Sequence, residues 1–156
     1  MIMKQIKQIS IWLIALVGLM TVTNAVQADD YSFKYNGLYY KITASGPLPL
    51  RHYVKVVPEK AGYPYYSDAN KPKGAVVVPE KFTRKVGIGP LSPSHTYIVT
   101  EIGEYAFYGC KGLTSVSIPT VQVIGNEAFR ECSWMTSVRI SGNALRKIGD
   151  AAFAGC

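Results

Sequence analysis

The side chains that could do chemistry in this sequence are few and scattered. Its two histidines, His52 and His95, carry imidazoles that titrate near neutral pH and that serve elsewhere as bases or metal ligands. They stand in neither a His-x-x-x-His nor a His-Glu-x-x-His spacing, and no Gly-x-Ser-x-Gly sequence supplies an activated serine. Glu59 and Glu80 form no paired-carboxylate motif of the glycosidase kind. We therefore expect no catalytic residue and no enzyme activity.

Sites for cofactors, metals and nucleic acids are also missing from the sequence. Gly87-Ile88-Gly89 lacks the third glycine and the strand-to-helix setting of a dinucleotide loop, and we interpret it as a turn. The formal net charge is +7, yet no run of Lys or Arg exceeds two residues. We therefore expect no cofactor, no metal and no nucleic-acid partner. The positive charge is interpreted as ordinary surface, with some attraction to acidic glycans or anionic surfaces.

The strongest signal in the sequence is an internal repeat in the C-terminal third. Ile, Gly, Ala, Phe and Cys recur in register three times, at periods of 22 and 24 residues, which lie in the range of leucine-rich repeats. Ile, Ala and Cys stand at i, i+4 and i+8, which predicts a short helical turn entered through a glycine that tolerates tight or left-handed backbone. Alternation between the copies predicts short strands. The copies are residues 102–110, 124–132 and 148–156, the glycines are Gly103, Gly125 and Gly149, and the strand segments are residues 113–118 and 135–140.

This pattern resembles the BspA-like leucine-rich repeats of bacterial surface antigens. Leu-Thr-Ser-Val-Ser-Ile-Pro at residues 113–119 and Val-Ile-Gly-x-x-Ala-Phe-x-x-Cys at residues 123–132 carry the likeness, which covers residues 97–156 and extends loosely to Ala-Val-Val-Val-Pro at 75–79. The resemblance implies a curved solenoid in an exported or surface-displayed protein that adheres to host or extracellular-matrix proteins. Members of the family usually carry many copies, and the last unit here has two extra residues, so the extent of the binding surface stays open.

Three segments follow from composition and charge. Residues 1–28 are predicted to be a signal peptide, because Lys4 and Lys7 precede a ten-residue apolar stretch and small residues precede Asp29. A retained membrane anchor is the alternative, but it needs about 20 apolar residues. Residues 29–100 hold nine of the eleven tyrosines and ten Lys/Arg against five Asp/Glu, whereas residues 101–156 hold five of each charge. We therefore predict a β-rich N-terminal cap over 29–100 and leucine-rich repeats over 101–156, an α/β repeat fold in which each unit is a short strand plus a short helical turn.

Local patterns in the predicted cap indicate strands. Asn36-Gly37, between two segments of alternating aromatic and polar residues, is a strong signal for a β-hairpin. Further strands are predicted at residues 53–57, 75–78 and 97–100, separated by loops rich in proline. A cap of this kind covers the apolar end of a solenoid.

The three cysteines, Cys110, Cys132 and Cys156, occupy the same position in each repeat. An exported chain permits disulfides, but three cysteines cannot pair fully within one molecule. Equivalent side chains in stacked repeats point in parallel, so we favour a ladder of buried free thiols, with a disulfide between two of them as the alternative. Zinc binding is not supported, because paired Cys-x-x-Cys spacing is absent.

The functional prediction is an exported, non-enzymatic interaction module that binds a protein or glycan on a host or cell surface. Such a protein is secreted or held at the cell surface, with no stable membrane span once the signal peptide is removed. A secreted glycan-binding or glycan-acting protein and an inert truncated remnant are the alternatives, and an open last repeat predicts self-association. The candidate binding residues are the outward-facing strand positions Ser115, Ser117, Ser137 and Arg139, and the loop tyrosines Tyr65 and Tyr66, which either form a recognition patch or pack the cap.

Overall fold

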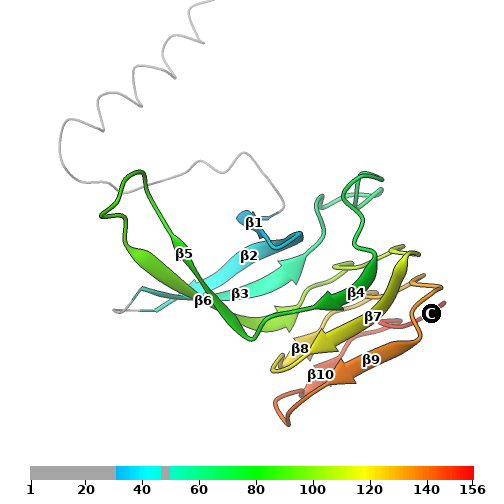
Figure 1. The fold of residues 1–156 in the computed structure, drawn as a ribbon. Coiled ribbons are helices and arrows are strands. Elements are labelled where there is room, and N and C mark those ends of the chain that lie inside the picture. Colours follow the sequence, from blue (N-terminus) through cyan, green and yellow to red (C-terminus); the bar gives the residue numbers. More distant parts are fainter. Residues whose placement is uncertain (1–30, 47–49) are drawn as a thin grey trace, which may run out of the picture.

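The computed structural model describes residues 31–46 and 50–156 (Figure 1). The predicted signal peptide lies outside the described residues. Within them the chain forms strands and turns, and no helix is long and apolar enough to cross a membrane. The strands are β1 (Phe33–Tyr35), β2 (Leu38–Ser45), β3 (Arg51–Val57), β4 (Gly74–Val77), β5 (Lys81–Lys85), β6 (Ser94–Ile102), β7 (Leu113–Ile118), β8 (Val123–Ile124), β9 (Ser137–Ile140) and β10 (Lys147–Ile148).

The strands make two sheets. The larger has the order β1-β2-β3-β6-β8-β10, with β5 also paired to β6, and the smaller has the order β4-β7-β9. β1 and β2 are antiparallel and are joined by Asn36 and Gly37, both with left-handed φ (46° and 79°), as a two-residue hairpin turn requires. The hairpin predicted from Asn36-Gly37 is confirmed.

Parallel pairing turns the C-terminal half into a solenoid. β6, β8 and β10 stack side by side in one sheet, while β7 and β9 stack in the other, so each turn of the chain contributes a strand to both sheets. β3 and β4 form the turn before the first repeat, because β3 pairs in parallel with β6 and β4 with β7. The sequence likeness of residues 75–79 to 115–119 therefore reflects structural stacking.

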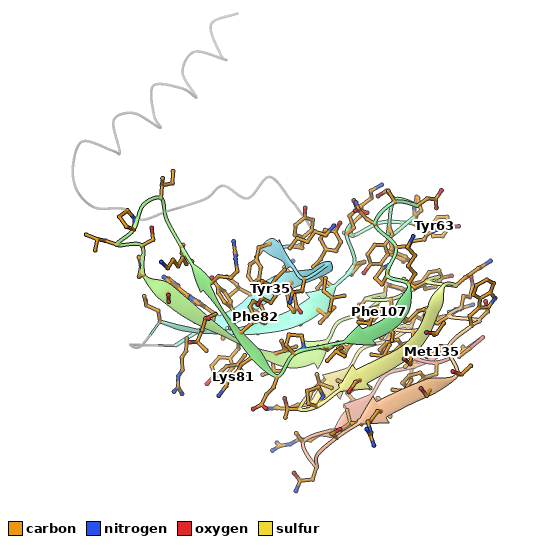
Figure 2. All side chains as sticks on the ribbon, in the orientation of Figure 1. Tyr35, Tyr63, Lys81, Phe82, Phe107 and Met135 are labelled. Carbon is orange, nitrogen blue, oxygen red and sulfur yellow. The ribbon has the colours of Figure 1, made fainter. Side chains whose placement is uncertain are left out.

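One hydrophobic core runs through the described residues on both sides of the predicted cap boundary. Buried residues extend from Leu38 in β2 to Ala152 in the last turn. Phe107 stacks on Phe129, with ring centroids 5.0 Å apart, and Phe129 stacks on Phe153 at 5.2 Å. Figure 2 shows Phe107 between the two sheets, and Phe82 with Tyr35 in the cap. The charge step at residue 100 falls inside β6, and the sheet continues across it.

The predicted helical turn in each repeat is not confirmed, because the backbone amides alternate between two sets of partners. In the first repeat, every second amide bonds three residues back, whereas the amides between them donate to the next turn of the solenoid. An i to i−4 ladder cannot form when alternate amides leave the segment. The internal donors are Ala106, Tyr108 and Cys110, and the donors to the next turn are Tyr105, Phe107 and Gly109. The four-residue spacing of Ile, Ala and Cys therefore marks stacked turns.

Glycine at the repeat entry is required by close approach between turns. A Cβ added to Gly125 would lie 2.6 Å from the backbone nitrogen of Glu104, and one added to Gly149 would lie 2.5 Å from that of Asn126. Left-handed φ occurs at other positions, such as Tyr105 (56°) and Glu127 (51°). The sequence analysis therefore picked out the right glycines, but its reason was wrong: these positions need glycine because a Cβ would collide with the neighbouring turn, and not because their backbone is left-handed.

Candidate interaction surface

The outer side of the β4-β7-β9 sheet carries two aligned columns of side chains, which we call the outer face. One column is Ala75, Ser115 and Ser137, and the other is Val77, Ser117 and Arg139. Residues between them on each strand turn inward, as period-two alternation requires, and Val116 is fully buried. The structure thus brings the four predicted strand residues, Ser115, Ser117, Ser137 and Arg139, onto one surface.

The outer face is small and weakly cationic. Ser137 and Arg139 are exposed, whereas Ser115 and Ser117 are half-buried because β7 lies between two other strands. Val77 leaves 70% of its surface exposed, which adds an apolar patch beside the serine hydroxyls. The hydroxyls donate and accept hydrogen bonds and the guanidinium of Arg139 can pair with a carboxylate, so the face suits a polar or acidic protein surface.

Two exposed apolar residues near this sheet were missed from the sequence. Val77 reads as a buried strand residue in Ala-Val-Val-Val, and only the register with Ser117 and Arg139 places it outside. Trp134 is exposed just before β9, at the position that Gly112 occupies in the preceding turn. A large aromatic residue where the repeat elsewhere has glycine is the signal that would have identified Trp134.

Tyr66 does not belong to a recognition surface, and that prediction is wrong. Only 2% of its surface is exposed, and its hydroxyl donates a hydrogen bond to the backbone carbonyl of Ala106 in the first repeat. Its ring meets Tyr39 edge-on. Burial raises the pKa of the Tyr66 phenol well above its ordinary value. Tyr66 therefore joins the cap to the solenoid.

Tyr65 lies in a cluster of four tyrosines. Its ring stacks on Tyr105, with centroids 4.5 Å apart and planes within 10°, and it meets Tyr63 and Tyr108 edge-on. Tyr63 is 80% exposed, and Figure 2 shows it at the outer end of the loop between β3 and β4. This tyrosine cluster combines residues of the cap and of the first repeat, so Tyr65 has a packing role and also borders an exposed aromatic surface.

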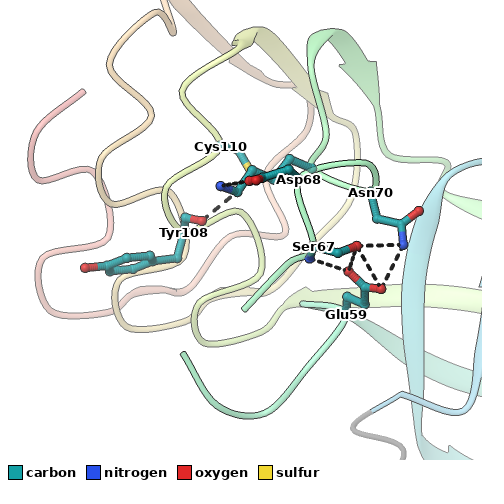
Figure 3. Close-up of polar contacts among 7 residues, drawn as sticks. Glu59, Ser67, Asp68, Asn70, Tyr108 and Cys110 are labelled. Carbon is teal, nitrogen blue, oxygen red and sulfur yellow. Dashed lines mark hydrogen bonds and ion pairs between the residues drawn. The ribbon is translucent and has the colours of Figure 1, made fainter. Parts of the chain in front are cut away.

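Glu59 holds the loop between β3 and β4 in shape (Figure 3). Its carboxylate accepts hydrogen bonds from the backbone amide of Ser67 at 2.7 Å, the Ser67 hydroxyl at 2.9 Å and the Asn70 side-chain amide at 2.8 Å. Burial acts to raise the pKa of Glu59, but these hydrogen bonds outweigh it and lower the pKa. An ionised carboxylate fixed in this way has a structural role.

The two histidines come together at the end of the larger sheet. His52 Nε2 lies 2.7 Å from His95 Nδ1, and His52 Nδ1 lies 2.9 Å from the hydroxyl of Ser45. The His52 ring also stacks on Tyr97. Burial and then the neighbouring His95 lower the pKa of His52. Among the described residues no group of three His, Cys, Asp or Glu is placed to hold a metal ion.

The cysteines form a ladder of free thiols. Cys110 and Cys132 are buried and Cys156 is exposed. The Cys132 thiol donates to the carbonyl of Phe107 at 3.0 Å, and the Cys156 thiol donates to that of Phe129 at 3.1 Å. Burial raises the pKa of Cys132 to about 12 and raises that of Cys110 further. The thiols of Cys132 and Cys156 therefore tie their turns to a carbonyl of the previous turn, whereas the Cys110 thiol donates within its own turn, to the carbonyl of Tyr108.

Comparisons with known proteins agree with this geometry. Residues 94–156 match the family model described as "BspA type Leucine rich repeat region (6 copies)". No curated protein matches the chain. Two solved structures resemble it. A leucine-rich repeat protein from Bacteroides ovatus ATCC 8483 is 24% identical with a TM-score of 0.51, over 81% of this chain and 33% of that one. The pneumococcal vaccine antigen PcpA is 19% identical with a TM-score of 0.51, over 79% of this chain and 30% of that one.

The two resemblances show a shared fold. The chain spans about a third of the length of each of these solved proteins. The family match covers β6 to the last turn, which is the part of the solenoid built from Ile-Gly-x-x-Ala-Phe-x-x-Cys. Residues 94–156 therefore form a BspA-type leucine-rich repeat region, and the chain shares the fold of leucine-rich repeat proteins.

Proposed function

We propose that this chain is an exported protein-interaction module without catalytic activity and that it binds its partner through the outer face. The observation that supports this proposal is the register of β4, β7 and β9, which aligns Val77, Ser117 and Arg139 in one column on the outer side of the sheet. Leucine-rich repeat proteins suit such a role, because stacked repeats present a continuous surface to a partner.

The size of the outer face predicts weak binding. β4, β7 and β9 have four, six and four residues, so at the rise and spacing of strands the three-stranded sheet presents about 230 Å². A standard interface buries about 800 Å² on each partner. The described part of the chain therefore supplies less than half of such an interface, and added turns of the same kind should strengthen binding.

The test is charge reversal on the outer face. A variant with Ser117→Glu and Arg139→Glu should lose binding to immobilised extracellular-matrix proteins and stay folded, because neither side chain contributes to the core. Its melting temperature should fall only slightly, from repulsion between the two glutamates on paired strands. A variant with Ser133→Glu and Lys147→Glu makes the same change in charge at exposed positions outside this sheet, and it should bind like the parent. Equal binding by all three proteins would contradict the assignment of the site.

Export is part of the proposal and rests on residues 1–28. The basic start, the apolar stretch and the small residues before Asp29 support cleavage after Ala28. The fold is also that of a pneumococcal vaccine antigen, in keeping with display outside the cell. Intact-mass measurement of the secreted protein should give a chain that begins at Asp29. Recovery of the full-length chain in the membrane fraction would contradict export.

A glycan partner is the second candidate, and the tyrosine cluster favours it. Tyr63 is exposed beside the stacked pair of Tyr65 and Tyr105, and such rings can stack on the apolar face of a sugar. If binding survives the Ser117→Glu, Arg139→Glu variant but is lost with Tyr63→Ser and Tyr65→Ser, the site lies on the tyrosine cluster. The two variants thus separate the two candidate surfaces.

A further inference from the structure

The β5–β6 hairpin ends in an apolar loop that is part of neither the outer face nor the tyrosine cluster. Residues 86–93 form this loop, which we call the hairpin tip, beyond the last paired residues, Lys85 and Ser94. Ile88 and Leu91 are fully exposed, at 106% and 96%. Figure 1 shows the hairpin projecting away from the solenoid. Two large aliphatic side chains therefore stand in water at the end of a projecting element.

Backbone hydrogen bonds and two glycines define the conformation of the hairpin tip. The amide of Val86 donates to the carbonyl of Pro93 at 3.0 Å, and the amide of Ser92 donates to that of Gly89 at 3.3 Å. Gly87 and Gly89 adopt left-handed φ of 117° and 119° on either side of Ile88, a conformation that other residues adopt rarely. The tip contains no ionisable side chain. The fold thus presents an uncharged, apolar loop of defined conformation.

The part of the larger sheet next to the tip carries only positive charge, because the acidic residue of β6, Glu101, lies seven residues along the strand from Ser94. Residues 31–58 contain four Lys/Arg and residues 81–100 contain three, and neither segment contains an Asp or Glu. Lys85 adjoins the tip, and Arg51 pairs with Thr96, two residues from the end of the hairpin. Glu80 is the nearest acidic residue before the tip in the chain, six residues before Val86, or about 20 Å along an extended strand.

We infer that the hairpin tip inserts into the interfacial layer of an anionic lipid bilayer, with Ile88 and Leu91 among the acyl chains and Lys85 and Arg51 at the headgroups. Membrane-surface segments combine apolar side chains at a depth of about 5–10 Å with flanking cations, and the tip has both parts. An eight-residue loop reaches about 10 Å beyond its paired ends, which matches this depth. An acidic glycan would meet the cations but would leave Ile88 and Leu91 in water.

The test places a reporter at the tip, so that membrane contact by residues 1–28 cannot imitate the result. The sequence has two tryptophans, Trp12 and Trp134. In a Trp12→Phe, Trp134→Phe background, Leu91→Trp makes the tip the only source of tryptophan fluorescence. Vesicles of phosphatidylglycerol and brominated phosphatidylcholine should quench it and shift its emission to the blue. The same background with Tyr63→Trp places the reporter in the loop between β3 and β4, where no quenching is expected.

Partitioning of the mature chain, which begins at Asp29 under the proposed cleavage, measures the contributions without membrane contact by residues 1–28. Ile88→Ser and Leu91→Ser should each lower binding to anionic vesicles about tenfold, because burying such a side chain has that effect or more. Lys85→Gln should lower it about fivefold. Ile148→Ser, at an exposed aliphatic residue in β10 that lies outside both the tip and the outer face, is the matched control and should change nothing. An unquenched tip reporter would overturn the inference. Vesicle binding that Ile88→Ser and Leu91→Ser leave intact would also overturn it. So would a result in which the parent chain does not bind vesicles and these variants instead lose binding to a protein partner.

Discussion

Replacing Gly125 by alanine tests the claim that close approach between solenoid turns requires glycine. The added Cβ would lie 2.6 Å from the nitrogen of Glu104, 2.8 Å from the carbonyl carbon of Gly103 and 3.1 Å from the Cα of Glu104. All three are backbone atoms, so no side chain can move aside. Ordinary contact begins at 3.4 Å, so the two turns must separate by about 0.8 Å.

The expected loss of stability follows from that displacement. Overpacking of this kind costs about 1–3 kcal/mol. The same movement stretches two hydrogen bonds between these turns, from Gly125 to Ile102 at 2.8 Å and from Tyr105 to Asn126 at 3.2 Å, each worth about 1 kcal/mol. Alanine also stiffens the unfolded chain, which offsets roughly 0.4–1 kcal/mol. We therefore expect the free energy of unfolding to fall by about 2–3 kcal/mol and the melting temperature to fall by about 10 °C.

The assay is urea and thermal unfolding followed by circular dichroism, with Gly62→Ala as the matched control. An added Cβ at Gly62 meets no atom within 4 Å, and its φ lies outside the left-handed region, so this variant should be as stable as the parent or slightly more stable. If Gly125→Ala melts within about 2 °C of Gly62→Ala, a difference worth under 1 kcal/mol, the close approach is not what requires glycine.

Three further predictions concern side chains in the cap and the ladder. Cys110 and Cys132 should resist thiol reagents until denaturant is added, because burial raises their pKa values. The exposed Cys156 should react first. Labelling that requires a reductant would instead indicate a disulfide. Folding lowers the pKa of His52, so the unfolded chain binds more protons, and the stability that this group contributes should be present above pH of about 6.5 and lost as the pH falls below it. His52→Gln should flatten that part of the plot of stability against pH. An unchanged slope would show that His52 does not cause this pH dependence. Tyr66→Phe removes the hydrogen bond to Ala106 and should lower the free energy of unfolding by about 1 kcal/mol, whereas Tyr63→Phe, at an exposed ring, should leave it unchanged in the same urea titration.

Local chemistry made several features predictable from the sequence. Asn36-Gly37 predicts its hairpin because the left-handed φ that the turn needs is accessible to those residues. The alternation in Leu113–Ile118 predicts both the strand and the side on which Ser115 and Ser117 lie, since a strand has a side-chain period of two. The recurrence of Cys110 and Cys132 predicts stacked, parallel thiols, because equivalent positions in a repeat have equivalent environments.

Other features depend on contacts between residues far apart in the sequence, so only the tertiary structure decided them. The i, i+4, i+8 spacing of Ile102, Ala106 and Cys110 is compatible with a helix until the amides of Tyr105 and Phe107 bond to the next turn. Tyr65 and Tyr66 are neighbours in a loop, and the sequence does not distinguish their exposure. Tyr66 is buried against the first repeat, where its hydroxyl donates a hydrogen bond to the carbonyl of Ala106, 40 residues away.

The sequence by itself therefore determined the repeat, its strands and four residues of the outer face, Ser115, Ser117, Ser137 and Arg139, because these follow from periodicities that the turns share. The tertiary structure decided the hydrogen-bond partners, the reason for each entry glycine and the exposure of individual side chains such as Val77. It also placed β1, β2, β3, β5 and β6 in one sheet behind the hairpin tip, with Glu101 near the end of β6 that is far from the tip. These properties arise when distant segments approach one another, and a pattern read along the chain carries no information on that approach.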